Sequence, residues 1–174
     1  MKDEFINNEI WTLIFGAAFQ RANVYKIINA DNLKQDFKKA TRQYIEKSVL
    51  PKYKRNNIKD EAHIASIQAI SNFTSNYSKL LKGGKLNFGI SQKLLNLYLK
   101  YLWCQNKLGV PPHFPVDRRI QERLNFKPII SWTKINKVDD YMKIISFARK
   151  NKEAKYKSIA EMELAYFERR IRTS

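Results

Sequence analysis

Residues 94–103 constrain the fold more than any other stretch of the chain, because nearly every residue in it is apolar. Read as a helix, this stretch leaves only a narrow polar stripe, formed by Lys93, Asn96 and Lys100 at offsets of three and seven. Such a helix must be buried nearly all round, with one wet edge that begins at Lys93. The rest of the chain is therefore expected to fold around it. The apolar residues are Leu94, Leu95, Leu97, Tyr98, Leu99, Tyr101, Leu102 and Trp103.

The other segments also favour helix, since the chain has only five glycines, five prolines and few alternating β-branched runs. A chain of 174 residues with 44% hydrophobic content is long enough for one well-filled core. We predict an all-α fold, a compact helical bundle with two lobes in which residues 1–174 form a single domain. The expected helices cover residues 7–28, 31–50, 60–81, 117–126 and 138–148, with one more from residue 91 and a last one from residue 158.

Specific residues set these boundaries. Asp31 is a suitable N-cap and Pro51 a suitable helix end, while Gly83 and Gly84 stop the third helix and Ser91 caps the fourth. Leu13 and Leu33 belong to the inner faces of the first two helices. Ser158 and Glu161 form a capping box for the last helix, in which Ile171 packs inward and Arg169, Arg170 and Arg172 remain outside.

The charge of the chain points to a polyanionic partner. There are 33 Lys and Arg against 16 Asp and Glu, a formal net charge of +17, and the excess is spread along the whole sequence. A folded basic surface of this kind favours nucleic acid, because neutralising phosphates releases counterions. DNA is therefore the predicted partner. A membrane is not, since the basic residues are not gathered on one amphipathic helix.

The single cysteine, Cys104, excludes an internal disulfide, a four-cysteine zinc site and a four-cysteine iron–sulfur cluster. It ends an apolar run, so we expect it to pack in the core. His63 has no Cys or His near it in the sequence, and we predict neither a metal nor a cofactor. The charged start of the chain does not read as a signal peptide, which predicts a cytoplasmic protein, and we expect a monomer.

Lys93 and Asp117 are the candidate reactive pair. A helix capped by Ser91 would hold Lys93 in its first turn, and Asp117 stands where the next helix begins. A nucleophilic lysine acts as the neutral amine, and the partial positive charge of a helix N-terminus disfavours the protonated form. The sequence therefore predicts a lowered pKa for Lys93. Asp117, held by backbone N–H groups, would be a fixed carboxylate.

The segment Gly89-Ile-Ser-Gln-Lys93, an apolar helix and then Pro115-Val-Asp117-Arg-Arg119-Ile120 together resemble the signature region of the helix-hairpin-helix DNA glycosylases. The Val-Asp-x-Arg-Ile form is most similar to the archaeal oxoguanine DNA glycosylase/lyase branch. The resemblance covers about the central fifth of the chain, around residues 83–126. Ser91 stands where the family hairpin usually has a second glycine, and the absence of four cysteines excludes the endonuclease III branch.

The resemblance implies an all-α fold of two lobes with a helix-hairpin-helix element, a DNA duplex across the hairpin, and a target base flipped into the cleft between the lobes. It implies that Lys93 is the amine nucleophile and Asp117 the carboxylate that assists it. A flipped base must be held by stacking and by hydrogen bonds to its edge. The candidates for that role are Trp11, Phe15, Gln20, Trp103, His113 and Trp132. The candidate DNA-backbone contacts are Gly89, Ser91, Gln92, Lys100, Arg118 and Arg119.

Three functions follow from these features. The first is a DNA glycosylase, with or without abasic-site lyase activity, acting in base excision repair or against phage DNA with modified bases. The second is a non-catalytic nucleic-acid binding module that uses the hairpin and the basic face. The third is a helical interaction subunit with an acidic protein partner. A carboxylate beside phosphates would repel them, so Asp117 favours the first over the second.

Overall fold

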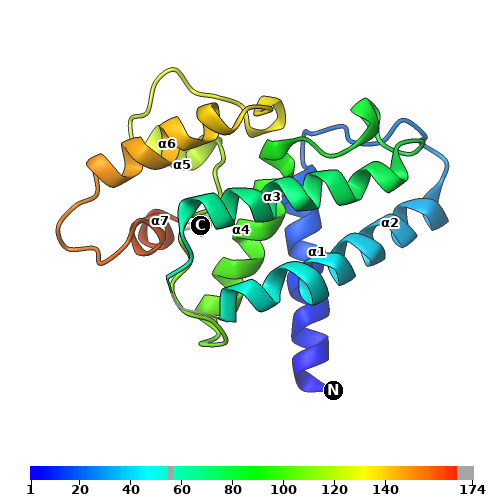
Figure 1. Cartoon of the computed structure of the whole chain (residues 1–174), viewed down its shortest axis with the longest axis horizontal. Helices are drawn as coiled ribbons and strands as arrows, with labels where there is room; N and C mark the ends of the chain where they lie inside the picture. Colours follow the sequence, from blue (N-terminus) through cyan, green and yellow to red (C-terminus); the bar gives the residue numbers. More distant parts are fainter. Residues whose placement is uncertain (55–56, 168–174) are drawn as a thin grey trace, which may run out of the picture.

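Helix α4 (Phe88–Cys104) runs through the centre of the structure, and the other helices lie around it (Figure 1). This computed structural model describes residues 1–54 and 57–167. Within them the chain is helical or irregular, with no strand beyond one isolated bridge between Tyr25 and Leu81, so the predicted all-α class is confirmed. The other helices are α1 (Lys2–Phe19), α2 (Asp31–Tyr44), α3 (Asp60–Phe73), α5 (Arg118–Arg123), α6 (Val138–Lys150) and α7 (Ile159–Tyr166).

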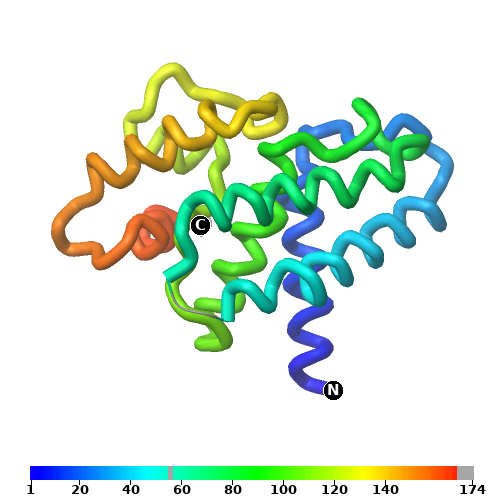
Figure 2. The backbone as a smooth tube through the Cα atoms, in the orientation of Figure 1, coloured from blue at the N-terminus to red at the C-terminus, as the bar shows by residue number. Residues whose placement is uncertain are grey.

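The two halves of the chain lie on different sides of α4. Helices α1 and α3 pack directly against it, with α2 packed on α3, while α5, α6 and α7 gather on the other side (Figure 2). The short 3-10 segment Trp132–Lys134 also packs on α4. Every residue of α4 from Phe88 to Lys100 is buried. The central, enclosed position of this helix is therefore as predicted, but its expected wet edge is wrong.

The start of α4 differs from the prediction. Asn87, not Ser91, is the N-cap, and its side-chain oxygen accepts a hydrogen bond from the Ile90 N–H at 2.9 Å. Ser91 lies inside the helix, fully buried, and its hydroxyl has no hydrogen-bond partner in the described part of the chain. Lys93 consequently lies in the second turn. The argument from a helix N-terminus therefore does not apply to it, since that effect is confined to the first turn.

The first two helices also end differently from the prediction. Helix α1 stops at Phe19 and not near Ile28, because Arg21 and Asn23 adopt positive φ angles of 63° and 46° that no helix continues. Leu13 and Leu33 are both exposed, so their placement on inner faces was wrong. Ala30 caps α2, and Asp31 is its first residue.

Proline did not end the second helical segment. A π-helical turn, Ile45–Val49, and a 3-10 helix, Leu50–Lys54, carry the chain past Pro51, which lies in the first turn of the 3-10 helix, where its missing N–H is tolerated. Helix α3 ends at Phe73 and is followed by the 3-10 helix Thr74–Tyr77. A further 3-10 turn, Lys82–Gly84, holds both glycines, each at positive φ.

The C-terminal part follows the prediction as far as it is described. Ser158 caps α7, its hydroxyl accepting from the Glu161 N–H at 3.0 Å. Ile171, Arg169, Arg170 and Arg172 lie outside the described residues. Cys104, at the last position of α4, is exposed, so its expected place in the core was wrong.

Candidate functional site

Lys93 and Asp117 meet where α4 passes the start of α5. The Lys93 Nζ lies 3.7 Å from the Asp117 Oδ2, with the lysine side chain 7% exposed and the aspartate side chain 27% exposed. The other carboxylate oxygen, Oδ1, accepts a hydrogen bond from the Ile120 N–H at 3.1 Å, which makes Asp117 the N-cap of α5. One carboxylate therefore both caps a helix and faces an amine. The two residues meet, as expected of a reactive pair, but the lysine is enclosed and does not lie open to a cleft.

Trp132 completes the immediate surroundings of the amine. The Lys93 Nζ lies 3.9 Å from the centroid of the Trp132 ring, well within the range of a cation–π contact. The tryptophan is buried, and its indole N–H has no hydrogen-bond partner within residues 1–54 and 57–167. The amine is thus enclosed between a carboxylate and an aromatic face.

Burial lowers the pKa of Lys93, because desolvation disfavours the ammonium ion. The Asp117 carboxylate opposes this effect, and the nearby Arg119 guanidinium adds to it. The predicted direction of the shift is therefore confirmed, but its predicted cause is wrong. The enclosed position of α4 lowers the pKa, and the helix N-terminus does not.

Gly89 allows residues 130–135, which we call the Trp132 segment, to pack closely against the start of α4. Its N–H donates to the Ile135 carbonyl at 2.9 Å, and a Cβ atom on residue 89 would lie only 1.8 Å from the Trp132 carbonyl oxygen. Only glycine allows the two backbones to approach so closely. Gly89 is buried and its N–H is occupied, so its predicted contact with a DNA backbone was wrong.

Two buried glutamines hold the backbone on either side of Asp117. The Gln92 amide makes two hydrogen bonds with Val116, donating to its carbonyl at 2.9 Å and accepting from its N–H at 3.1 Å. The Gln121 amide pairs in the same way with Ile130, at 2.7 and 2.8 Å, and also donates to the Asp117 carbonyl at 3.0 Å. The first glutamine therefore sets Asp117 against α4, and the second sets the Trp132 segment against Asp117.

The predicted DNA-backbone contacts divide into buried and exposed groups. Ser91, Gln92 and Lys100 are buried, so assigning them to phosphates was wrong. The Lys100 ammonium lies 2.7 Å from a Glu163 carboxylate oxygen in a buried ion pair that ties α4 to α7. Only Arg118 and Arg119 are exposed, directly after Asp117.

The candidates for a base pocket are not brought together. Trp11, Phe15 and Gln20 line a groove between α1 and α2, while Trp103 is half-buried near the end of α4. His113 is buried in a separate hydrogen-bond network. Of the six candidates, Trp132 is the one that contacts the Lys93–Asp117 pair in the described part of the chain.

His113 and His63 belong to a network of buried polar side chains next to the site. The Tyr141 hydroxyl accepts from the Asn96 amide at 3.0 Å and lies 2.9 Å from the His113 Nδ1, while the His113 Nε2 lies 3.0 Å from an Asp60 oxygen. A neutral ring protonated on Nε2 satisfies all three contacts. Burial lowers the pKa of His113 to about 4 and that of His63 to about 3.

Stability should fall in acid because of these histidines. The folded-state pKa of His113 lies below its unfolded value of 6.5, so the unfolded chain binds more protons as the pH falls from 6.5 toward 4. His113 alone should then lower the free energy of unfolding by about 3 kcal/mol over that window, and His63 should add to the loss. Urea unfolding at several pH values would measure it. In His113→Gln the slope over the same window should be clearly smaller, and an unchanged slope would contradict the assignment.

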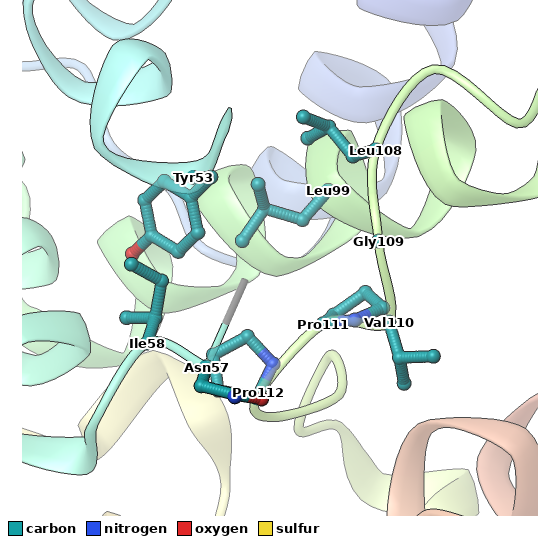
Figure 3. A pocket seen from close by; sticks show the side chains of 9 residues that line it. All are labelled: Tyr53, Asn57, Ile58, Leu99, Leu108, Gly109, Val110, Pro111 and Pro112. Atoms are coloured by element: carbon teal, nitrogen blue, oxygen red, sulfur yellow. The ribbon is translucent and has the colours of Figure 1, made fainter. Parts of the chain in front are cut away.

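The cavity shown in Figure 3 lies elsewhere. It has a volume of about 550 Å³ and is lined by Tyr53, Leu99, Leu108, Pro111 and Pro112, among others. Neither Lys93, Asp117 nor Trp132 lines this cavity, so the amine is not reached from it.

Sequence reasoning missed Gln121 and Glu163. A partner such as Glu163 could have been expected from the sequence. Lys100 lies on the polar stripe of an otherwise apolar helix, and a buried lysine requires a negative charge beside it. The burial of Glu163 raises its pKa, and Lys100 opposes that shift. Gln121 carried no signal, since an amide in a short charged helix reads as a surface residue.

Comparison of the chain with protein-family models, with curated proteins and with solved structures finds no match in any of the three. Across the residues that the structure describes, no helix combines the length and hydropathy needed to cross a membrane. In the same residues, no three His, Cys, Asp or Glu side chains gather so that they could hold a metal ion.

Proposed function

We propose that the protein is a DNA glycosylase with lyase activity, which removes a damaged or modified base using Lys93 and Asp117. The observation that carries the proposal is the contact between the two: a buried lysine with a lowered pKa lies 3.7 Å from a carboxylate fixed by a helix cap. Buried amines of lowered pKa next to a charged partner are typical of reactive sites.

The chemistry follows from the bond that is cut. As the N-glycosidic bond breaks, its electron pair leaves with the base and positive charge develops on the deoxyribose ring, which the Asp117 carboxylate stabilises. The neutral Lys93 amine bonds to the same sugar carbon and gives up a proton to the departing base. Its lone pair then expels the ring oxygen, which takes up a proton from solvent, and a Schiff base forms. Loss of a C2′ proton to solvent lets the 3′ phosphate leave and breaks the strand.

Access to the amine requires Trp132 to move. Lys93 is only 5% exposed, and the tryptophan ring covers its ammonium group. We infer that DNA binding displaces the ring from Lys93 and that the freed indole stacks on the flipped base. Its unpartnered N–H is then free to donate to an edge of that base.

The basic character of the chain supports DNA as the substrate. The net charge is +17, and Arg118 and Arg119 are exposed beside Asp117, where they can hold the phosphates flanking the target nucleotide. In this proposal α1–α3 and α5–α7 form the two lobes on either side of the cleft that receives the flipped base.

Trapping with borohydride is the direct test. The protein should be incubated with duplexes that contain an oxidised purine, an alkylated base or a modified cytosine, together with sodium borohydride. The expected product is a covalent protein–DNA adduct formed by the natural sequence and absent from Lys93→Gln. Lys134→Gln, on the exposed part of the neighbouring segment, is the matched control and should still be trapped. No abasic site on any of these duplexes would contradict the proposal.

One observation favours a non-catalytic nucleic-acid binding module instead. Trp132 covers Lys93, while Gln92 and Gln121 hold the backbone around Asp117. This arrangement would also suit an ion pair with a purely structural role. That alternative predicts DNA affinity that falls steeply with salt and does not change when Lys93 is replaced by glutamine.

A further inference from the structure

A second concave surface, which we call the α1–α2 groove, lies between α1 and α2 and has a volume of about 650 Å³. Its lining includes neither Lys93, Asp117 nor Trp132, and it is formed by the helices on the other side of α4 from α5 (Figure 1). Any ligand of this groove is therefore held by a different part of the protein from the reactive pair.

Aromatic side chains form the floor of the groove. Trp11, Phe15 and Phe19 follow one another along α1 with ring centroids 5.4 Å apart at each step, and Tyr25 continues the row 5.9 Å beyond Phe19. Trp11 and Phe15 are buried, so the partly exposed Phe19 and Tyr25 are the rings that a ligand can reach. Gly16 leaves the middle of the floor open, since a Cβ atom there would meet nothing within 4 Å.

The two walls differ in chemistry. On the α1 side, Thr12 and Gln20 are exposed and supply hydrogen-bonding groups. On the α2 side stand Lys38 and Lys39, and no carboxylate in the described residues pairs with either. The Lys38 Nζ lies 5.9 Å from the Phe15 ring centroid, so its charge sits directly beside the aromatic floor.

Two features mark the ends of the groove. At one end Arg42 is already occupied, because it donates to Glu46 at 3.0 Å and to Asn8 at 2.6 Å. At the other, the Tyr25 hydroxyl is buried without a hydrogen-bond partner in residues 1–54 and 57–167.

We infer that the α1–α2 groove binds a single-stranded segment of nucleic acid, with bases or sugars against the aromatic floor and phosphates on Lys38 and Lys39. Grooves that bind single strands combine cations along the backbone with aromatic side chains for the bases. An acidic peptide would use the lysines but leave the aromatic row and the opening at Gly16 without a role. The inference does not depend on the proposed glycosylase chemistry.

Fluorescence anisotropy with a labelled oligothymidine of about ten nucleotides tests the inference. Lys38→Glu/Lys39→Glu should weaken binding at least about tenfold at low salt and reduce the dependence of log K on log[salt] by about 1.4, or roughly 0.7 for each lysine. Lys143→Glu/Lys150→Glu, a pair of exposed lysines on α6, makes the same change in net charge and is the matched control. Equal weakening by both double variants would mean that only overall charge matters, and would overturn the inference.

Three further measurements separate this site from others. Gly16→Gln fills the open floor without touching the core and should weaken binding about as much as the double lysine variant, whereas an unchanged affinity would contradict the assignment. A polyglutamate peptide should compete poorly; competition equal to that of the oligonucleotide would make the groove a general anion site. Lys38→Glu/Lys39→Glu should still form the borohydride adduct on a duplex that is cut, so loss of this site and loss of catalysis are distinguishable.

Discussion

Replacing Asp117 with asparagine is expected to lower the rate of base excision about a thousandfold while leaving helix α5 capped. Asparagine is as good an N-cap as aspartate, so the hydrogen bond from the Ile120 N–H can persist. What the variant loses is the negative charge beside the Lys93 amine, which we propose stabilises the sugar. Single-turnover assays on the duplex that is cut would give the rate, and thermal unfolding would report the stability.

The same substitution also acts on the lysine. Asp117 opposes the effect of burial on Lys93, so its removal should lower the pKa of Lys93 further. The matched control is Glu122→Gln, which removes a carboxylate that pairs with Arg118 on the exposed side of α5. Equal losses of activity in the two variants would mean that Asp117 has no special role. Full activity in Asp117→Asn would exclude this residue from the chemistry.

Replacing Gly89 with alanine is expected to destabilise the protein by about 3 kcal/mol, a large effect for one methyl group. The added Cβ would lie 1.8 Å from the Trp132 carbonyl oxygen and 3.0 Å from the Ile135 Cβ. The carbonyl oxygen belongs to the backbone, so it cannot rotate away from the clash as the end of a side chain can. The Trp132 segment must therefore shift from α4. Urea unfolding would measure the loss, and the fluorescence of the variant should report a more exposed tryptophan.

Gly16→Ala provides the matched control, since it makes the same chemical change in another helix. Gly16 is exposed, and nothing lies within 4 Å of its added Cβ, so the variant should be more stable by about 0.5–1 kcal/mol because alanine favours helix. The two glycine variants should therefore change stability in opposite directions. A neutral Gly89→Ala would show that the Trp132 segment does not need its close contact with α4.

The prediction from sequence was most successful where hydrophobic pattern decides the structure. The apolar run of residues 94–103 correctly predicted an enclosed helix. Asp117 was also correctly predicted to lie at the start of the next helix, where it is the N-cap. The proximity of Lys93 and Asp117 came from a resemblance to glycosylases and could not have come from periodicity. Hydrophobic pattern sets which face of a helix is buried but does not set which helices meet.

The errors around the site share one physical origin. A polar or small residue reads as a surface residue in the sequence, even when a distant segment of the chain packs over it and buries it. Ser91 and Asn87 are both good caps, and only the register of α4 against residues 132–135 distinguishes them. Gly89 suggested a hairpin that binds phosphate but serves instead for contact between two backbones. Gln92 and Lys100 are polar, and partners distant in the sequence, Val116 and Glu163, allow them to be buried.

The packing of α1 against α4 affects how the chain can be made in the cell. Helix α1 leaves the ribosome before α4, with Trp11, Ile14 and Phe15 on a face that is covered in the finished protein partly by α4. Until residues 88–104 have been synthesised, that face lacks its partner, and exposed apolar surface of this kind promotes aggregation. The nascent chain is therefore expected to benefit from a chaperone until α4, which contains Lys93, has been translated.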